Sequence, residues 1–151
     1  MKAKKKVRTG IVGSGFSATF HFEAIRKVYE ADIEVVGVHS VAVDQGKEYA
    51  SKRDIRFFDT LEAMLDEVDV IHVCVPPKWH EPISVAGLHR DKFVVCEKPL
   101  TGYFGDGSED FHWDRADMGV ALESALASVD RVMEAERNSK GRLLYAENWV
   151  Y

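Results

Sequence analysis

Residues 7–18 read Val7-Arg-Thr-Gly-Ile-Val-Gly-Ser-Gly-Phe-Ser-Ala18, a β-branched run that leads directly into two closely spaced glycines. The run predicts a strand over 7–12. A helix is predicted over 16–29, because apolar side chains recur at helical spacing there. These apolar positions are Ala18, Phe22, Ile25, Val28 and Tyr29.

The turn between this strand and this helix carries the G-x-G-x-x-A form of the dinucleotide fingerprint, in the strand–turn–helix context that its mechanism requires. Gly13 permits the tight turn, Gly15 lets the backbone approach a pyrophosphate, and Ala18 lets the helix pack closely on the strand. The free N–H groups at the start of the helix attract phosphate. The turn therefore predicts a cofactor cradle, which also includes Ser14, Phe16 and Ser17.

Strand and helix patterns alternate along the rest of the chain. Further strands are predicted at 33–38, 55–58, 70–75, 93–96 and 142–146, and further helices at 44–52, 61–65, 79–89 and 118–138. The last helix is expected to bury one broad apolar face, made of Ala121, Leu122, Ala125, Leu126, Val129, Val132 and Met133. This alternation predicts an α/β fold, a three-layer doubly wound parallel sheet of about six strands in the order 3-2-1-4-5-6. Ligands bind such sheets at the carboxyl ends of the strands.

The chain has 151 residues, which suits a single nucleotide-binding domain over 1–151. Residues 101–117 contain glycines, aromatics and acids with no period, and we interpret them as a loop insertion. A loop of this length is usually functional or disordered, and its aromatic content argues against plain disorder.

The residue at the end of the second strand decides whether a site of this kind prefers NAD or NADP. An acid there favours NAD through the ribose 2′-hydroxyl, and a nearby Arg accepts the 2′-phosphate of NADP. This sequence has His39-Ser40-Val41, so Ser40 is the candidate contact and either NAD or NADP remains open. NADP is slightly favoured, because no acid repels its phosphate.

Composition excludes several classes of function. The formal net charge of −5 argues against nucleic-acid or anionic-membrane partners, and no apolar run is long enough for a spanning helix. No apolar segment follows the N-terminal lysines as it does in a secretory signal. Two cysteines, Cys74 and Cys96, suit a reduced environment and core positions, so we expect a cytoplasmic protein. No set of residues has metal-ligand spacing, and no metal is expected.

Two later segments complete a family pattern: Val75-Pro-Pro-Lys-Trp-His80 and Glu97-Lys-Pro-Leu100. With the fingerprint, they make the chain resemble the Gfo/Idh/MocA oxidoreductases, the group of glucose-fructose oxidoreductase and inositol dehydrogenase. The resemblance covers nearly all of the chain except 101–117. Its most specific element is the Glu-Lys-Pro tripeptide directly after the fifth strand.

The resemblance implies roles for this tripeptide. Lys98 matches the catalytic lysine at the nicotinamide and the reacting carbon, and Glu97 matches the acid that lines the cofactor site beside it. Pro99 matches the proline of an often-cis peptide. Independently of the family, a lysine at the carboxyl end of a parallel strand stands where ligands bind, and it can polarise a carbonyl or orient an alcohol.

The other matched positions line the nicotinamide ribose. Val75, Pro76, Pro77 and His80 fall on the family's Thr-Pro-Asn-x-x-His segment, and Asn148 falls where the sixth strand delivers an Asn. Pro77 replaces the usual Asn, so one side-chain hydrogen bond is lost there. His72 alternates with apolar neighbours in its strand, and we interpret it as a core histidine with a satisfied hydrogen bond.

The resemblance implies an NAD(P)-dependent dehydrogenase that acts on a CH–OH group of a sugar, cyclitol or polyol by hydride transfer. In the family, a C-terminal domain that carries substrate groups and the homo-oligomer contacts follows the sixth strand. This chain lacks it, so we expect the fragment alone to be inactive. Two alternatives stay open: a non-catalytic dinucleotide-sensing or regulatory module, and a methyltransferase with a similar glycine loop.

Overall fold

The computed structural model describes residues 5–105 and 111–147. Its strands are β1 (Lys6–Val12), β2 (Asp32–His39), β3 (Arg56–Phe58), β4 (Val70–Val73), β5 (Phe93–Glu97) and β6 (Leu143–Ala146). Its α-helices are α1 (Phe16–Ile25), α2 (Val43–Ser51), α3 (Leu61–Leu65), α4 (His80–Leu88) and α5 (Met118–Arg137). Short 3₁₀ turns cover η1 (Pro77–Trp79) and η2 (Trp113–Arg115).

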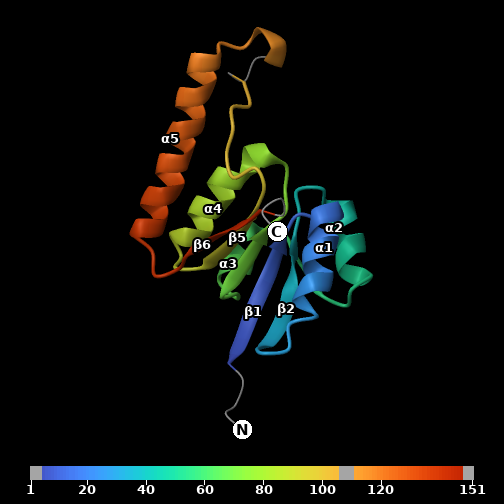
Figure 1. The fold of residues 1–151 in the computed structure, drawn as a ribbon. Coiled ribbons are helices and arrows are strands. Elements are labelled where there is room, and N and C mark those ends of the chain that lie inside the picture. The colour runs from blue at the N-terminus through green and yellow to red at the C-terminus, as the bar shows by residue number, and fades with distance from the viewer. Residues whose placement is uncertain (1–4, 106–110, 148–151) are drawn as a thin grey trace.

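The strands form one parallel sheet in the order β3-β2-β1-β4-β5-β6, which confirms the predicted doubly wound topology. Figure 1 shows α1 and α2 on one side of the sheet and α4 and α5 on the other. The order reverses between β1 and β4, where the crossovers leave in opposite directions. Such a reversal opens a crevice at the carboxyl ends of the two strands.

Each face of the sheet has its own apolar core. One core joins Ile11 and Val38 to Ala18, Phe22 and Tyr49 of α1 and α2. The other core packs α3, α4 and α5 against the opposite face through Met64, Leu65, Leu88, Val132 and the strand residues Val12, Ile71, Val73 and Val94. Burial on both faces explains the nearly continuous apolar runs in the strands.

The first helix is shorter than predicted. It ends at Ile25, and the N–H groups of Lys27 and Val28 turn to the carbonyls three residues earlier. Val28 and Tyr29 lie beyond the helix end and are exposed, although their spacing matched the buried face. The apolar spacing in the sequence therefore extends beyond the residues of the helix that pack against the sheet.

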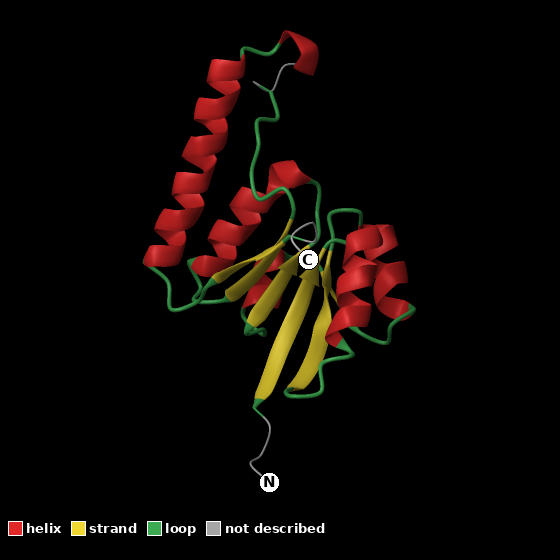
Figure 2. Cartoon of the chain, in the orientation of Figure 1, coloured by secondary structure: helices red, strands yellow, loops and turns green. Residues whose placement is uncertain are grey.

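The broad apolar face predicted for α5 is wrong. Leu122 and Leu126 are more than half exposed, and the buried positions form a narrow stripe of small residues with Val132. Figure 2 shows why: the N-terminal part of α5 extends past the end of the sheet, so it has no layer to pack against. The buried members of the stripe are Ala121, Ser128, Val132 and Ala135.

The segment expected to be a loop has local order in its described parts, 101–105 and 111–117. Tyr103, Phe111 and Trp113 form an aromatic cluster with ring centroids 5.6 to 6.4 Å apart. Asp117 then caps α5, because its Oδ1 accepts the N–H groups of Gly119 at 2.8 Å and Val120 at 3.1 Å.

In the part of the chain that the structure describes, no helix is long and apolar enough to cross a membrane.

Candidate functional site

A cavity of about 710 Å³ lies where the fold predicts a ligand, at the carboxyl edge between β1, β2 and β4. Three chain segments form most of its wall, and each directly follows one of these strands. The wall consists of residues 12–17, residues 39–42 with Gln45, residues 74–76 with Trp79, and the side chains of Leu61 and Ile83. The cavity brings together Gly13, Ser14, Gly15, Phe16, Ser17, Ser40, Val75 and Pro76 among the predicted cofactor residues.

Gly13 makes the sharp turn out of β1. Its φ is +111°, a backbone region that side chains rarely adopt, and its N–H donates to the His39 carbonyl at 2.8 Å. A Cβ at this position would lie 2.2 Å from the Cys74 carbonyl oxygen. Only glycine therefore lets the segments after β1 and β4 lie this close together.

Gly15 faces the open cavity. A Cβ added there meets no atom within 4 Å, so the space in front of this residue is free. Gly15 is also the N-cap of α1, so the cap residue has no side chain to offer the helix N–H groups, and the first turn carries no acid. Uncapped N–H groups and the helix dipole attract an anion. The residues present therefore fit a dinucleotide, with its pyrophosphate at the start of α1.

The end of the cavity next to β2 is polar. Ser40 is buried, and its Oγ lies 3.0 Å from the Oγ of Ser14. The Gln45 side chain donates to the Ser14 carbonyl at 3.4 Å, and the His39 ring is held by the Phe58 carbonyl at 3.0 Å. Among the described residues that line the cavity, none is an Asp, Glu, Lys or Arg. The hydroxyls of Ser14 and Ser40 are thus among the polar contacts available to a ribose.

His80 joins the segments that follow β4 and β5. Its side chain is only 1% exposed, with Nδ1 2.7 Å from the Pro99 carbonyl and Nε2 2.9 Å from the Val75 carbonyl. The Lys98–Pro99 peptide is cis, as the family pattern implied. His80 lies behind the cavity wall, whereas Pro77 opens η1 and lines a smaller hollow of about 170 Å³ with Lys78 and Thr101.

Glu97 and Lys98 lie at the end of β5, beside the cavity wall. One oxygen of Glu97, Oε2, accepts the Lys98 backbone N–H at 3.1 Å, so the carboxylate holds the backbone of the lysine. The Lys98 side chain is exposed, and none of the described carboxylates lies within ion-pair distance of its ammonium. The ammonium is therefore available to a bound substrate. Asn148 lies outside the described residues.

Sequence reasoning missed a histidine pair at this edge. The Nδ1 atoms of His21 and His72 lie 2.8 Å apart, and His21 Nε2 lies 3.1 Å from Glu97 Oε1. His72 has a hydrogen-bond partner, as expected, but it is only partly buried and its partner comes from α1. The alternation of β4 gave the available signal, since it turns His72 to the face that α1 covers, opposite to Ile71 and Val73.

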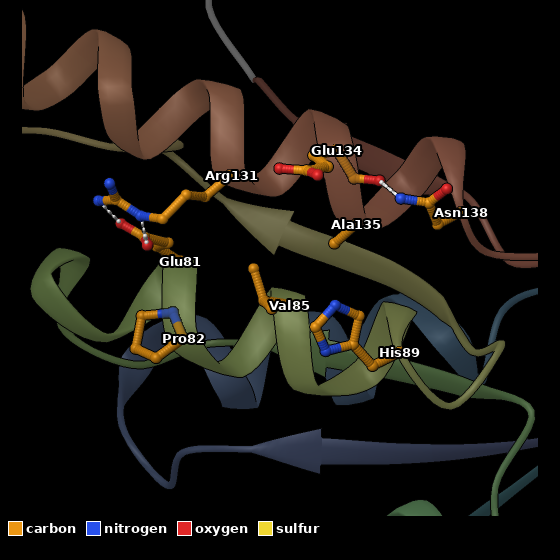
Figure 3. Close-up of a pocket in the computed structure, with 8 residues that line it drawn as sticks. All are labelled: Glu81, Pro82, Val85, His89, Arg131, Glu134, Ala135 and Asn138. Atoms are coloured by element: carbon orange, nitrogen blue, oxygen red, sulfur yellow. Dashed lines mark hydrogen bonds and ion pairs between the residues drawn. The ribbon is translucent and has the colours of Figure 1, made fainter.

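Other features of the structure lie away from this edge. A groove of about 370 Å³ lies between α4 and α5. Figure 3 shows the Arg131 guanidinium in contact with Glu81 there. Arg131 Nη2 donates to Glu81 Oε2 at 2.9 Å, and this hydrogen bond holds the pKa of Glu81 below its usual range. The groove belongs to the helix layer and includes no strand end. Within the described ranges, no group of three or more His, Cys, Asp or Glu is arranged to hold a metal.

The chain is similar to known oxidoreductases. Residues 7–112 match the Gfo/Idh/MocA family model, described as an oxidoreductase family with an NAD-binding Rossmann fold. Inositol 2-dehydrogenase of Corynebacterium glutamicum is 31% identical in an alignment of 107 positions that covers 64% of this chain and 29% of that protein. UDP-N-acetylglucosamine 3-dehydrogenase of Acidithiobacillus ferrooxidans is 27% identical over 95 residues, which are 63% of this chain and 29% of that protein.

A solved structure shares the fold over nearly the whole chain. GenD2 from gentamicin A biosynthesis, in complex with NAD, has a TM-score of 0.73 at 21% identity and covers 97% of this chain and 36% of its own. The chain spans about three tenths of the length of the curated relatives that it matches, 29% of the two named above. The family match covers more than two thirds of the chain, and the chain belongs to the Gfo/Idh/MocA oxidoreductases, whose NAD-binding Rossmann fold it adopts.

Proposed function

We propose that this chain is the nucleotide-binding part of an NAD(P)-dependent dehydrogenase that oxidises a secondary alcohol of a sugar, cyclitol or related polyol. One arrangement carries the proposal: the start of α1 opens onto a large cavity, and an exposed lysine, with no described carboxylate within ion-pair distance, lies at the adjacent strand end. The relatives named as inositol and amino-sugar-nucleotide dehydrogenases support the class of substrate.

The residues of this chain divide the binding work. The N–H groups at the start of α1 bind the pyrophosphate, with Gly15 leaving room for it. The hydroxyls of Ser14 and Ser40 bind the ribose, and the missing acid at Ser40 slightly favours NADP. Val75 and Pro76 form an apolar wall that keeps water from the nicotinamide end. When bound, the nicotinamide supplies the hydride acceptor that no side chain provides.

Lys98 acts on the substrate oxygen. Its ammonium would donate a hydrogen bond to the substrate oxygen and stabilise the negative charge on this oxygen as the hydroxyl proton passes to water or a base. Loss of hydride from the adjacent carbon then converts the oxygen into a carbonyl. Its place at the carboxyl end of β5 brings it to the edge where both ligands meet. We propose that the remaining substrate contacts, and the homo-oligomer contacts, come from residues outside this chain.

The test uses the full-length protein with NAD⁺ or NADP⁺ and three alcohols: myo-inositol, glucose 6-phosphate and UDP-N-acetylglucosamine. Absorbance of the reduced nicotinamide measures turnover, and calorimetry measures dinucleotide binding. Lys98→Met should abolish turnover and leave dinucleotide binding intact. Lys52→Met serves as the matched control, because Lys52 is exposed and paired with Glu48 on α2.

Two outcomes would overturn the proposal. A wild-type protein that binds neither dinucleotide contradicts the cofactor site. A protein that binds a dinucleotide but oxidises none of the alcohols favours the non-catalytic sensing module instead.

A further inference from the structure

A series of hydrogen bonds connects the cofactor-binding helix with the candidate catalytic lysine. His21 lies in α1, its Nδ1 lies 2.8 Å from Nδ1 of His72 in β4, and its Nε2 lies 3.1 Å from Glu97 Oε1. The two rings meet edge to face, with centroids 5.1 Å apart and planes at 84°. The other oxygen of Glu97 accepts the Lys98 N–H at 3.1 Å. Four groups from three elements thus form one connected series.

The chemistry of these groups sets the direction of each bond. Burial, followed by the charge of His21, lowers the pKa of His72 from 6.5 to about 3, so its ring is neutral at neutral pH. A carboxylate only accepts hydrogen bonds, so His21 Nε2 carries the proton shared with Glu97. Of the two Nδ1 atoms that face each other, one carries a hydrogen and the other accepts it, so the two rings share one hydrogen bond. Every bond in the series then has one donor and one acceptor.

The series also restrains Glu97 at both oxygens. His21 side-chain exposure is 12% and Glu97 side-chain exposure is 22%, so water competes little for the bond between them. A hydrogen bond to a charged group in such a place is stronger than one between neutral groups. The carboxylate that receives the Lys98 N–H is therefore oriented by a side chain of α1.

We propose that His21 is a positioning residue for Lys98: through its bond to Glu97, it makes the place of the lysine depend on the helix that binds the dinucleotide. This inference rests on the proposed function, in which Lys98 contacts the substrate. The competing explanation gives His21 a purely structural role, that of supplying a hydrogen-bond partner to the partly buried His72 ring.

A set of variants in the full-length protein separates the two explanations. His21→Leu alone would leave His72 without a partner, so it is combined with His72→Leu, because replacing both members of a buried polar pair by apolar groups is far better tolerated. His72→Leu alone keeps the bond from His21 to Glu97. His21→Gln keeps an N–H donor for Glu97 and tests rescue.

We expect the His21→Leu/His72→Leu protein to lose roughly 10- to 100-fold in kcat, since a small misplacement of a catalytic group has effects of this size. Its dinucleotide Kd should stay within about three-fold of the wild type, a change well under 1 kcal/mol. His72→Leu alone should keep kcat near the wild-type value, and His21→Gln should recover most of it. If His72→Leu alone lowers kcat as much as the double variant, or if the double variant keeps full kcat, the proposal is wrong.

A second readout does not need turnover. The backbone amide proton of Lys98, followed by NMR in lysine-labelled full-length protein, should move upfield when Glu97 loses its orientation in the double variant and stay in place in His72→Leu. If the wild type oxidises no alcohol but the amide moves as expected, the positioning role stands and the proposed function fails. If the wild type turns over substrate and the chemical shift of the Lys98 amide proton is the same in all variants, the positioning role is refuted.

Discussion

Gly13 and Gly15 belong to the same short motif, but the structure predicts opposite effects when each is replaced by Ala. At Gly15 the φ is −88° and the added Cβ meets no atom within 4 Å. Alanine fits there without strain, and it reduces the entropy of the unfolded chain. Gly15→Ala should therefore change the free energy of unfolding by less than about 1 kcal/mol.

The same methyl group enters the space in front of the α1 N-terminus. A phosphate there bonds to helix N–H groups, and each hydrogen bond to a charged group contributes about 1.5–3 kcal/mol. If the methyl group prevents two of these bonds, binding weakens by about 3 kcal/mol or more. The dinucleotide Kd should rise at least about 100-fold.

Gly13→Ala should act on folding instead. The φ of +111° disfavours any side chain, and the Cβ would lie 2.2 Å from the Cys74 carbonyl oxygen and 2.8 Å from its carbon. The backbone must shift, because the obstructing atoms are themselves backbone. The conformation alone costs about 1–3 kcal/mol, and with the clash we expect a loss above about 2 kcal/mol. For a chain of this size, Tm should fall by at least about 4 °C.

Thermal unfolding by circular dichroism and calorimetric titration with NAD⁺ and NADP⁺ measure both effects on the two variants. The wild type sets the reference for each. If Gly15→Ala binds dinucleotide as tightly as the wild type, the cavity in front of α1 is not the phosphate site. If Gly13→Ala unfolds at the wild-type temperature, the close approach of the two turns does not constrain the fold.

Three further predictions concern buried or partly buried side chains. Arg53 stacks 3.7 Å from the centre of the Tyr49 ring and donates to the Tyr49 carbonyl, so Arg53→Ala should lower the free energy of unfolding by roughly 1–2 kcal/mol in urea; an unchanged midpoint would contradict the stacking. Because burial lowers the pKa of His72 to about 3, its side chain binds a proton in the unfolded state but not in the folded state between pH 6.5 and 3. The free energy of unfolding should therefore fall as the pH drops from 6.5 towards 3. In His72→Leu, the urea midpoint should depend less on pH over that range than in the wild type. Burial raises the pKa of Cys74 to about 12 and that of Cys96 to about 11. Mass spectrometry should therefore find both thiols unlabelled by a disulfide reagent in the native chain and labelled after unfolding. Labelling of the native chain would show that the strand ends open.

The elements differ in how well the sequence predicted them. The strands and the order of the sheet followed from short-range patterns. The start of α3 is also set locally, because the Thr60 side chain accepts the Ala63 N–H. The predicted length of α1 and the predicted buried face of α5 were wrong, because the spacing of apolar residues does not indicate where the sheet ends. Val28 and Leu126 fit the helical period and are still exposed.

For the site, the sequence by itself determined the turn at Gly13, the open position at Gly15 and the placing of Lys98 at a strand end. These features depend on neighbouring residues, whose backbone preferences act locally. Only the tertiary structure decided that His21 meets His72, 51 residues away, and Glu97, 76 residues away. Contacts of this kind form when α1 packs across β4 and β5, and the side chains that meet there are set by the packing of the two layers rather than by spacing along the chain.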